Sequence, residues 1–245
     1  MPRDSKILVN EEFMPRDSKI LVNEKYKDIF IYILGRYFNC WNKINITEVG
    51  LYSLTNMSES EVIFKAVSSE IKNVGHKVST FVFIDGCAGM GFDTFVISYY
   101  TEVLSNELDT LHAKCIKQNI KILSSQAKEN EFAFILHKIR YSNFDISKFA
   151  SINKEIAGHY SNNKIALYLD PPFGGKDYSK KDKITLNIGE YKLGEFVKAS
   201  FNNITNLLLI VLKLPFNYNL TEFDNIGSSK KILNLIKLNI MIIWK

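Results

Sequence analysis

The hydrophobic pattern divides most of the chain into short apolar runs separated by amphipathic segments. Continuous apolar runs bounded by glycine or polar residues are typical of buried strands in a parallel sheet, and they occur at 81–85, 101–105, 132–136, 165–169 and 206–214. Helical spacing predicts helices at 58–72, 93–100, 109–123 and 191–203, and a polar helical segment at 144–164. This alternation predicts an α/β fold: a mainly parallel sheet with right-handed crossovers and helices on both faces.

The two ends of the chain are less regular. The segment 230–245 contains an apolar stretch that fits a helix followed by a strand as well as two strands. At the other end, residues 1–11 recur unchanged at 14–24. A repeat used only twice does not build a solenoid, so we expect the first copy to be dispensable and 1–24 to be poorly ordered in part. The expected division is a tail at 1–24, a helical extension at 25–75 and the main domain at 76–245.

Residues 25–41 interleave aromatic and basic side chains, such as Tyr26, Phe30 and Arg36. This pattern has two interpretations. Aromatic and basic residues together form surfaces that bind single-stranded nucleic acid. An aromatic stripe at helical spacing more often packs on the core. We favour the core interpretation and leave the other open.

Composition narrows the class of protein without defining it. The chain has 245 residues, and its net charge of +5 is compatible with a polyanionic partner. No apolar run is long enough for a membrane span, and the N-terminus is charged, so neither a transmembrane segment nor a signal peptide is expected. We expect a monomer in a reducing intracellular compartment, either cytoplasm or nucleus.

Cysteine and histidine usage argues against a metal centre or a disulfide framework. Cys40, Cys87 and Cys115 are odd in number and far apart in the sequence. His112 and Cys115 have the spacing of two ligands on one helix, but the sequence offers no second pair of ligands near them. No metal is therefore expected.

A glycine-rich loop follows the strand predicted at 81–85. Gly86, Gly89 and Gly91 stand where that strand turns into a helix, and glycine allows a ligand to approach the backbone closely. Their spacing differs from the dinucleotide fingerprint and better suits a nucleoside with a carboxylate-bearing tail, such as S-adenosylmethionine. Glu107, just beyond the second strand, is expected to accept the ribose hydroxyls. Adenine contacts are expected from one of the residues 143–145.

A second motif ends the strand predicted at 165–169. Asp170 is followed by Pro171 and Pro172, which have no backbone N–H, so the turn presents acceptors rather than donors. An exocyclic amino group of a nucleobase is the complementary ligand. Asp170 and the Pro171 carbonyl would accept its two hydrogens while Phe173 stacks on the ring. The alternative is a tight turn in which Asp170 caps a neighbouring helix.

The basic loop that follows, 176–183, could bind phosphates or be an ordinary solvated loop. These motifs together resemble the trimethylguanosine synthases, which methylate the exocyclic N2 of a 7-methylguanosine RNA cap. The similar segments appear in the expected order between about residues 30 and 220, and are Gly50–Thr55, Ile84–Thr94, Glu107–Asp109, Phe173–Tyr178 and Leu214–Asn217. The resemblance implies a Rossmann-like class I methyltransferase that uses S-adenosyl-L-methionine and acts on capped RNA or another nucleic acid.

The resemblance also assigns roles to individual residues. Catalysis would rest on the turn formed by Asp170, Pro171, Pro172 and Phe173. Substrate binding would involve Phe173, Gly174, Lys176, Tyr178 and Asn217. Cofactor binding would involve Ser53, Thr55, Asp85, Cys87, Ala88, Gly89, Gly91, Thr94, Glu107, Leu108, Asn143 and Asp170.

Three positions depart from the family pattern. Asp170 replaces a serine, Phe173 replaces the tryptophan that stacks on the methylated guanine, and Leu51 replaces another tryptophan. Phe173 keeps a smaller stacking face, and we hypothesise that Asp170 compensates by attracting the cationic 7-methylguanine. With this aspartate, the turn also resembles those of adenine-N6 and ribosomal guanine-N2 methyltransferases, and these two activities remain alternatives. A catalytically silent cap-binding or scaffold subunit is a third possibility.

Overall fold

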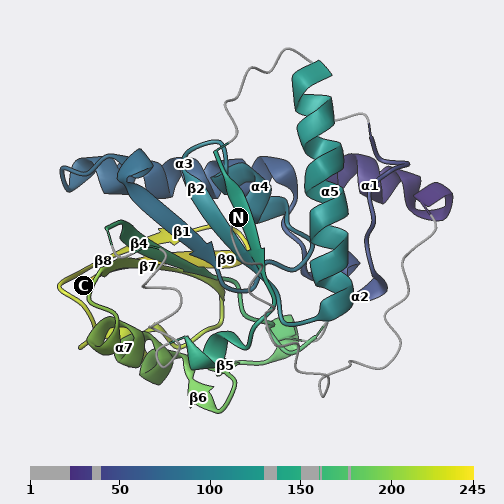
Figure 1. Cartoon of the computed structure of the whole chain (residues 1–245). Coiled ribbons are helices and arrows are strands. Elements are labelled where there is room, and N and C mark those ends of the chain that lie inside the picture. The colour runs from purple at the N-terminus through teal and green to yellow at the C-terminus, as the bar shows by residue number, and fades with distance from the viewer. Residues whose placement is uncertain (1–22, 35–39, 130–136, 150–159, 161, 176–177) are drawn as a thin grey trace.

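The computed structural model describes residues 23–34, 40–129, 137–149, 160, 162–175 and 178–245. A seven-stranded sheet forms its centre, with the strand order β3-β2-β1-β4-β7-β9-β8 (Figure 1). These strands are β1 (Phe81–Asp85), β2 (Glu102–Asn106), β3 (Ile139–Ser142), β4 (Lys164–Leu169), β7 (Leu207–Pro215), β8 (Ser229–Asn234) and β9 (Leu238–Trp244). The first five are parallel, and β9 runs antiparallel to β7 and β8. The predicted α/β fold class is confirmed.

Alternate residues of the central strands bury against two helical layers. In β1, Phe83 belongs to one hydrophobic cluster and Ile84 to the other. One face carries α3 (Met57–Asn73), α4 (Phe92–Ile97) and α5 (Thr110–Glu129), the last upright to the right of the sheet in Figure 1, and the opposite face carries α7 (Leu193–Asn203). Because both faces are covered, the central strands read as unbroken apolar runs.

Smaller elements complete the chain. Two short helices, α1 (Lys27–Leu34) and α2 (Glu48–Ser53), precede α3, and a small hairpin joins β5 (Asn187–Ile188) to β6 (Tyr191–Lys192). The 3₁₀ helices are Asn23–Tyr26, Val78–Thr80, Ile146–Lys148, Tyr178–Lys180 and Leu220–Phe223. Among the described residues, no helix has the length and apolar character needed to span a bilayer.

The predicted helical extension shares a core with the sheet. Phe30 of α1 and Phe64 of α3 are buried in the same cluster as Phe83 of β1. Packing on the core therefore accounts for the aromatic side chain of Phe30. It does not account for Tyr32 on the same helix, which is 70% exposed. The extension covers one face of the sheet rather than forming a separate core.

Several predicted boundaries need correction. The third strand of the sheet is β3 at Ile139–Ser142, a half-buried strand that the sequence analysis did not predict. The run predicted at 132–136 lies outside the described residues, as do most of the predicted helix at 144–164 and all of the tail at 1–22. The C-terminal segment forms two strands, β8 and β9.

Candidate functional site

The parallel register brings the predicted motifs to one edge of the sheet. Asp85, at the end of β1, pairs with Ser105 of β2 and Tyr168 of β4. Glu107 and Asp170 follow these two strands directly. The carboxyl edge of a parallel sheet is where ligands of α/β proteins bind, and the structure places the glycine loop, the acidic residue and the acceptor turn there together.

The glycine loop adopts backbone conformations that require glycine. Gly89 and Gly91 have φ values of +54° and +85°, in the left-handed region that other residues rarely occupy. A Cβ on Gly89 would meet no atom of a described residue within 4 Å, whereas a Cβ on Gly91 would lie 3.0 Å from Ile116 of α5. The absence of a side chain at Gly91 thus allows Ile116 of α5 to pack closely against the loop, whereas at Gly89 no described residue packs in this way.

Asp85 and Thr94 hold the two ends of the loop. The Thr94 hydroxyl donates to Asp85 Oδ2 at 2.5 Å and lies 3.0 Å from the Ser105 hydroxyl. Asp85 Oδ1 is buried and has no hydrogen-bond partner among the described residues. Burial, reinforced by Asp93, raises the pKa of Asp85 well above its ordinary value.

The remaining predicted loop residues lie close by. Ala88 is buried, and its backbone N–H donates to the Asn106 carbonyl at 3.0 Å. Cys87 is half-buried, and burial followed by the neighbouring Glu107 raises the pKa of its thiol well above the usual range. Cys87 is therefore a neutral thiol at physiological pH.

The carboxylate of Glu107 accepts hydrogen bonds from two backbone N–H groups nearby. Its Oε2 accepts from the Gly89 N–H at 2.7 Å and its Oε1 accepts from the Asp109 N–H at 2.9 Å. Burial raises the pKa of Glu107 to about 7, and these hydrogen bonds oppose the rise. The carboxylate expected to bind ribose thus lies against the glycine loop.

Asn143 and Asn106 tie three loops together. The Asn143 side chain donates to the carbonyls of Glu107 and Leu108, the latter at 2.9 Å. The Asn106 side chain donates to the Gly86 carbonyl at 3.2 Å and to the Phe144 carbonyl at 3.1 Å. Asn143 therefore holds the backbone of the loop that follows β2, while Leu108 is 45% exposed beside it.

The residues at this edge fit S-adenosylmethionine. Among the described residues, none approaches a Cβ position at Gly89 within 4 Å, so a ligand can come close to the backbone there. Asp85 Oδ1 and the carboxylate of Glu107 supply acceptors, which suits a molecule that carries an ammonium group and a ribose diol. A dinucleotide would instead need donors for a pyrophosphate.

The acceptor turn lies at the carboxyl end of β4. Pro171 is buried and Pro172 is exposed. The ring of Phe173 is half-buried and meets the ring of Tyr178 edge to face, with 5.2 Å between centroids. Gly174 and Gly175 both have positive φ, at 89° and 91°. They turn the chain back so that the two aromatic rings meet.

Asn217, two residues beyond the end of β7, holds the segment that follows this turn. Its amide nitrogen donates to the carbonyls of Tyr178 at 2.9 Å and Lys181 at 2.6 Å. Its Oδ1 is buried and has no partner among the described residues. Lys176 lies outside the described residues, whereas Lys180, Lys181 and Lys183 are exposed, so both interpretations of the basic loop stay open.

A buried lysine meets Asp170, and the sequence analysis missed it. Lys213 of β7 is 3% exposed, and its Nζ lies 2.5 Å from Asp170 Oδ2 and 3.5 Å from Asp93 Oδ2. It also donates to the hydroxyl of Thr55, and the Tyr168 hydroxyl donates to Asp93 Oδ2 at 3.3 Å. The signal was available: a single charge inside an apolar strand must be paired when buried.

The two predicted cofactor residues of the extension differ in their surroundings. Thr55 is buried in the cluster around Lys213, where its hydroxyl lies 3.5 Å from Asp93 Oδ2. Ser53 is exposed, and its hydroxyl donates to the Val49 carbonyl at 3.1 Å within α2. The structure therefore brings Thr55, but not Ser53, into contact with the residues around Asp170.

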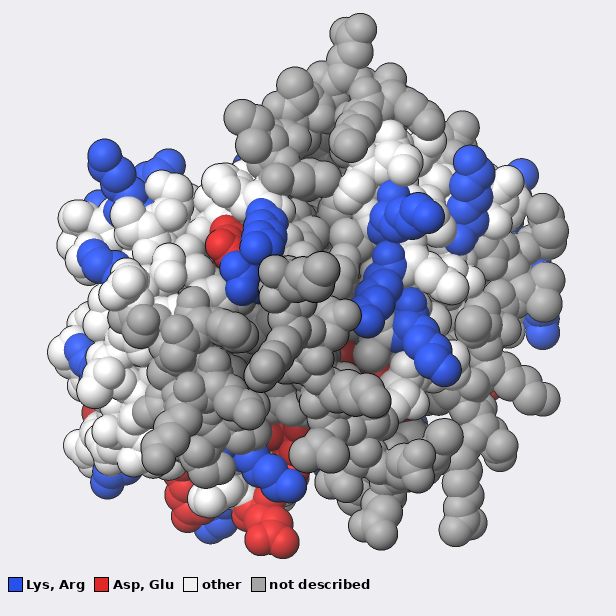
Figure 2. All heavy atoms as spheres, in the orientation of Figure 1, with Lys and Arg blue, Asp and Glu red and all other residues white. Residues whose placement is uncertain are grey.

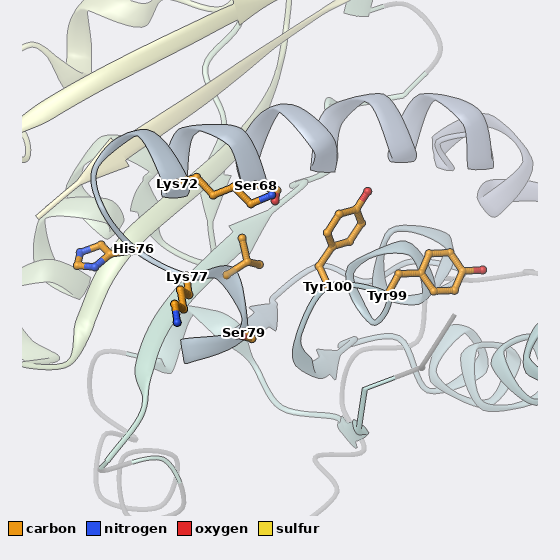
Figure 3. Close-up of a pocket in the computed structure, with 8 residues that line it drawn as sticks. Ser68, Lys72, His76, Lys77, Ser79, Tyr99 and Tyr100 are labelled. Atoms are coloured by element: carbon orange, nitrogen blue, oxygen red, sulfur yellow. The ribbon is translucent and has the colours of Figure 1, made fainter. Parts of the chain in front are cut away.

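A cavity of about 360 Å³ lies elsewhere, near the amino ends of β1 and β2 (Figure 3). Its lining includes Ser68 and Lys72 of α3, His76 and Lys77 of the following loop, and Tyr100 before β2. None of the predicted site residues that the structure describes contributes to it. In the part of the chain that the structure describes, no group of three or more His, Cys, Asp or Glu side chains is placed to hold a metal.

Comparison with known sequences decides the family. Residues 80–238, well over half of the chain, match the sequence model described as RNA cap guanine-N2 methyltransferase. The chain belongs to this family. The match includes the glycine loop, Glu107 and the acceptor turn. No curated protein matches the chain at a significant level.

Solved structures are similar to this chain in fold at low sequence identity. A hypothetical protein of Thermus thermophilus superposes with a TM-score of 0.51 at 12% identity, over 87% of this chain and 98% of that one. The 16S rRNA N2 G1207 methyltransferase of the same species, solved with AdoMet and guanosine, gives 0.45 at 14% identity over 81% of this chain. This chain spans only 43% of that enzyme's length. The precorrin-6y C5,15-methyltransferase of Geobacter metallireducens gives 0.44 at 12% identity, over 79% and 90% of the two chains.

For this member of the guanine-N2 methyltransferase family, two predictions are confirmed. The fold is the Rossmann-like sheet of the class I methyltransferases, and S-adenosyl-L-methionine is the cofactor. The narrower resemblance to trimethylguanosine synthases, and the roles of individual residues, stay predictions.

Proposed function

We propose that this protein transfers a methyl group from S-adenosylmethionine to the exocyclic N2 of guanine in RNA, and that the guanine is the 7-methylguanosine of a cap. The observation that carries the proposal is the turn from Asp170 to Phe173, which lies beside the glycine loop within the matched family region. The turn offers acceptors and a ring face, the two features that an aminopurine needs.

The turn suits guanine because of where its groups lie. Asp170 Oδ1 accepts no hydrogen bond from another described residue, and the two prolines offer carbonyls without competing N–H groups. These acceptors orient the amine by taking its two hydrogens. Phe173, braced by Tyr178, holds the ring in one plane.

Catalysis would be mainly positioning. S-adenosylmethionine supplies an activated methyl group when bound. The guanine amine is a weak base, so the protein gains most by holding its nitrogen in line with that methyl group. Asp170 is the nearest carboxylate to take the proton released at N2, and its pKa of about 6 lets it remain ionised at neutral pH.

An RNA substrate is supported by the charge on one helix. Lys114, Lys117 and Lys121 are exposed at helical spacing on α5, which begins beside the cofactor edge. Figure 2 shows basic side chains along the position of α5. Lysines in such a row contact backbone phosphates without reading the sequence.

The test is methyl transfer from tritiated S-adenosylmethionine to three RNAs of one sequence: 7-methylguanosine-capped, guanosine-capped and uncapped. The proposal expects label in the capped RNA with the 7-methyl group, and dimethylated or trimethylated guanosine after digestion. Equal transfer to uncapped RNA would reject the cap and favour an internal guanine. Label in adenine would reject guanine N2 altogether, and cofactor binding without turnover would favour a silent cap-binding subunit.

A further inference from the structure

Strand register places Lys213 beside the acceptor turn. Leu169 of β4 pairs with Leu212 of β7 in parallel. The next residue on each strand is Asp170 and Lys213, and their side chains meet at 2.5 Å. Lys213 is also covered from the other side, because it pairs with Ile240 of β9. The contact is therefore set by the sheet and not by a flexible surface side chain.

Lys213 is held as a cation despite its burial. Burial alone would lower its pKa, but Asp170 and then Asp93 outweigh that effect, and the pKa of Lys213 lies above its ordinary value. The Thr55 hydroxyl accepts a further hydrogen bond from Nζ. A buried ammonium with two carboxylates and a hydroxyl around it satisfies its donors.

The same groups set the pKa of Asp170. Burial raises its pKa, Lys213 lowers it, and Asp93 raises it again, giving a value of about 6. Lys213 occupies Oδ2, whereas Oδ1 accepts no hydrogen bond from another described residue, and the side chain is 17% exposed. One oxygen is thus committed to the ion pair, and the other has no partner among the described residues.

We propose that Lys213 is a positioning residue that keeps Asp170 ionised and fixes its Oδ2, so that Oδ1 is presented to the amine of the base. The role assigned to Oδ1 rests on the proposed function, but the control of Asp170 by Lys213 does not. The pairing would serve any substrate with an amine at this turn.

The pairing also changes how a cationic base is recognised. Asp170 and Lys213 together carry no net charge, so Lys213 offsets the attraction that a free carboxylate would exert on 7-methylguanine. Any preference for the 7-methyl group must then come mainly from stacking on Phe173. At a pH high enough to keep Asp170 ionised, removing the lysine charge should therefore strengthen binding of the cationic base relative to neutral guanine.

The first experiment needs neither cofactor nor substrate. The carboxyl carbon of Asp170 is followed by ¹³C NMR across a pH titration, with Asp170→Asn providing the assignment. In Lys213→Met we expect Asp170 to titrate at a pH at least about one unit higher than in the wild type, and in Lys213→Arg close to the wild-type value. Lys198→Met, at an exposed position on α7, is the control. An unchanged titration in a folded Lys213→Met protein overturns the proposal.

A second variant covers the case in which Lys213→Met does not fold. Asp93→Asn removes the like charge that acts on Asp170 and keeps one oxygen that can accept from either the Ser60 or the Tyr168 hydroxyl. Asp170 should then titrate at a lower pH. No change in this variant would show that the cluster does not control Asp170, and would count against the proposal.

Activity measurements then separate this inference from the proposed function. With capped RNA, Lys213→Met should lower kcat by about 100-fold and move the acid limb of the kcat profile to higher pH, with Lys213→Arg recovering both. A stable variant with lower kcat but an unmoved acid limb would indicate a merely structural role. If the wild type shows no transfer to guanine, the proposed function fails, while the NMR titration still decides the role of Lys213.

Discussion

The carboxylate of Glu107 accepts a hydrogen bond from the backbone amide of Gly89 at 2.7 Å. The residue expected to bind ribose and the loop expected to face the cofactor are therefore in direct contact. The second oxygen of Glu107 is bonded to the Asp109 amide. Ribose hydroxyls must share or replace these bonds, so the loop and the carboxylate respond to the cofactor as a unit.

Glu107→Gln is expected to weaken S-adenosylmethionine binding. A neutral amide has one acceptor oxygen in place of two, so it cannot accept from Gly89, Asp109 and a ribose diol equally well. Losing hydrogen bonds to a charged group costs about 1.5–3 kcal/mol, which corresponds to roughly 10- to 150-fold in Kd. Isothermal titration calorimetry measures this, with Glu190→Gln at an exposed position as the control. Equal affinity for S-adenosylmethionine in the two variants would show that Glu107 does not bind the cofactor.

Cofactor affinity should also depend on pH through Glu107. Its folded-state pKa of about 7 lies above the ordinary value of 4.5, so the folded protein holds an extra proton between these values. Glu107 therefore contributes less to stability as pH rises through this window. Ribose hydroxyls prefer the ionised acceptor, so affinity for S-adenosylmethionine should rise as pH increases through about 7. The rise should be absent in Glu107→Gln, and its persistence there would assign it to another group.

Much of the fold followed from the apolar runs. Strands such as β4, buried on both faces, appear as continuous hydrophobic stretches and were predicted at nearly the observed bounds. The strand β3 was missed because it is half-buried and contains Arg140 and Ser142, so it lacks that pattern. The C-terminal segment stayed ambiguous because exposed β8 and fully buried β9 follow each other closely.

The site was predictable only where it depends on local sequence. A glycine loop between a strand and a helix, or an aspartate before two prolines, is visible in one stretch. The contact between Lys213 and Asp170 depends instead on the register of two strands that lie far apart in the sequence. Asn143 and Asn217 show a further limit of prediction from sequence. A side-chain amide just beyond a strand can hydrogen-bond a ligand or a loop carbonyl, and the sequence does not distinguish the two. Here both amides donate to carbonyls.

Phe173 should determine how tightly the base is held. Phe173→Ala is expected to weaken binding of a cap analogue by about 1–3 kcal/mol, because the stacking face is lost. Phe173→Trp should tighten 7-methylguanosine more than guanosine, because a larger ring attracts a cation more strongly. Fluorescence titration with both nucleotides measures these effects, and Tyr191→Ala, an exposed aromatic on β6, is the control. Equal gains for both nucleotides in Phe173→Trp would contradict the cationic interaction.

The lysines of α5 should govern affinity for the RNA body. Replacing Lys114, Lys117 and Lys121 with alanine is expected to reduce the slope of log affinity against log salt by about 2, at roughly 0.7 per phosphate contact on a single strand. Affinity for an isolated cap nucleotide should stay unchanged. The matched control replaces three exposed lysines on α7 and β8, at positions 198, 230 and 231. If both triple variants lower the slope equally, the α5 lysines are not a specific contact site for RNA.

Gly91 and Gly75 form a matched pair for testing the loop. Both have similar positive φ, at +85° and +83°, so alanine at either position should cost a similar 1–2 kcal/mol of backbone strain, to order of magnitude. A Cβ on Gly91 would also lie 3.0 Å from Ile116, whereas one on Gly75 would meet no described atom within 4 Å. Gly91→Ala should therefore lower Tm further than Gly75→Ala in thermal unfolding, and it alone should weaken S-adenosylmethionine binding, because α5 and the loop must separate to fit the methyl group. Equal losses of stability with unchanged cofactor affinity in both variants would show that the loop tolerates this displacement and that its glycine is needed for backbone conformation alone.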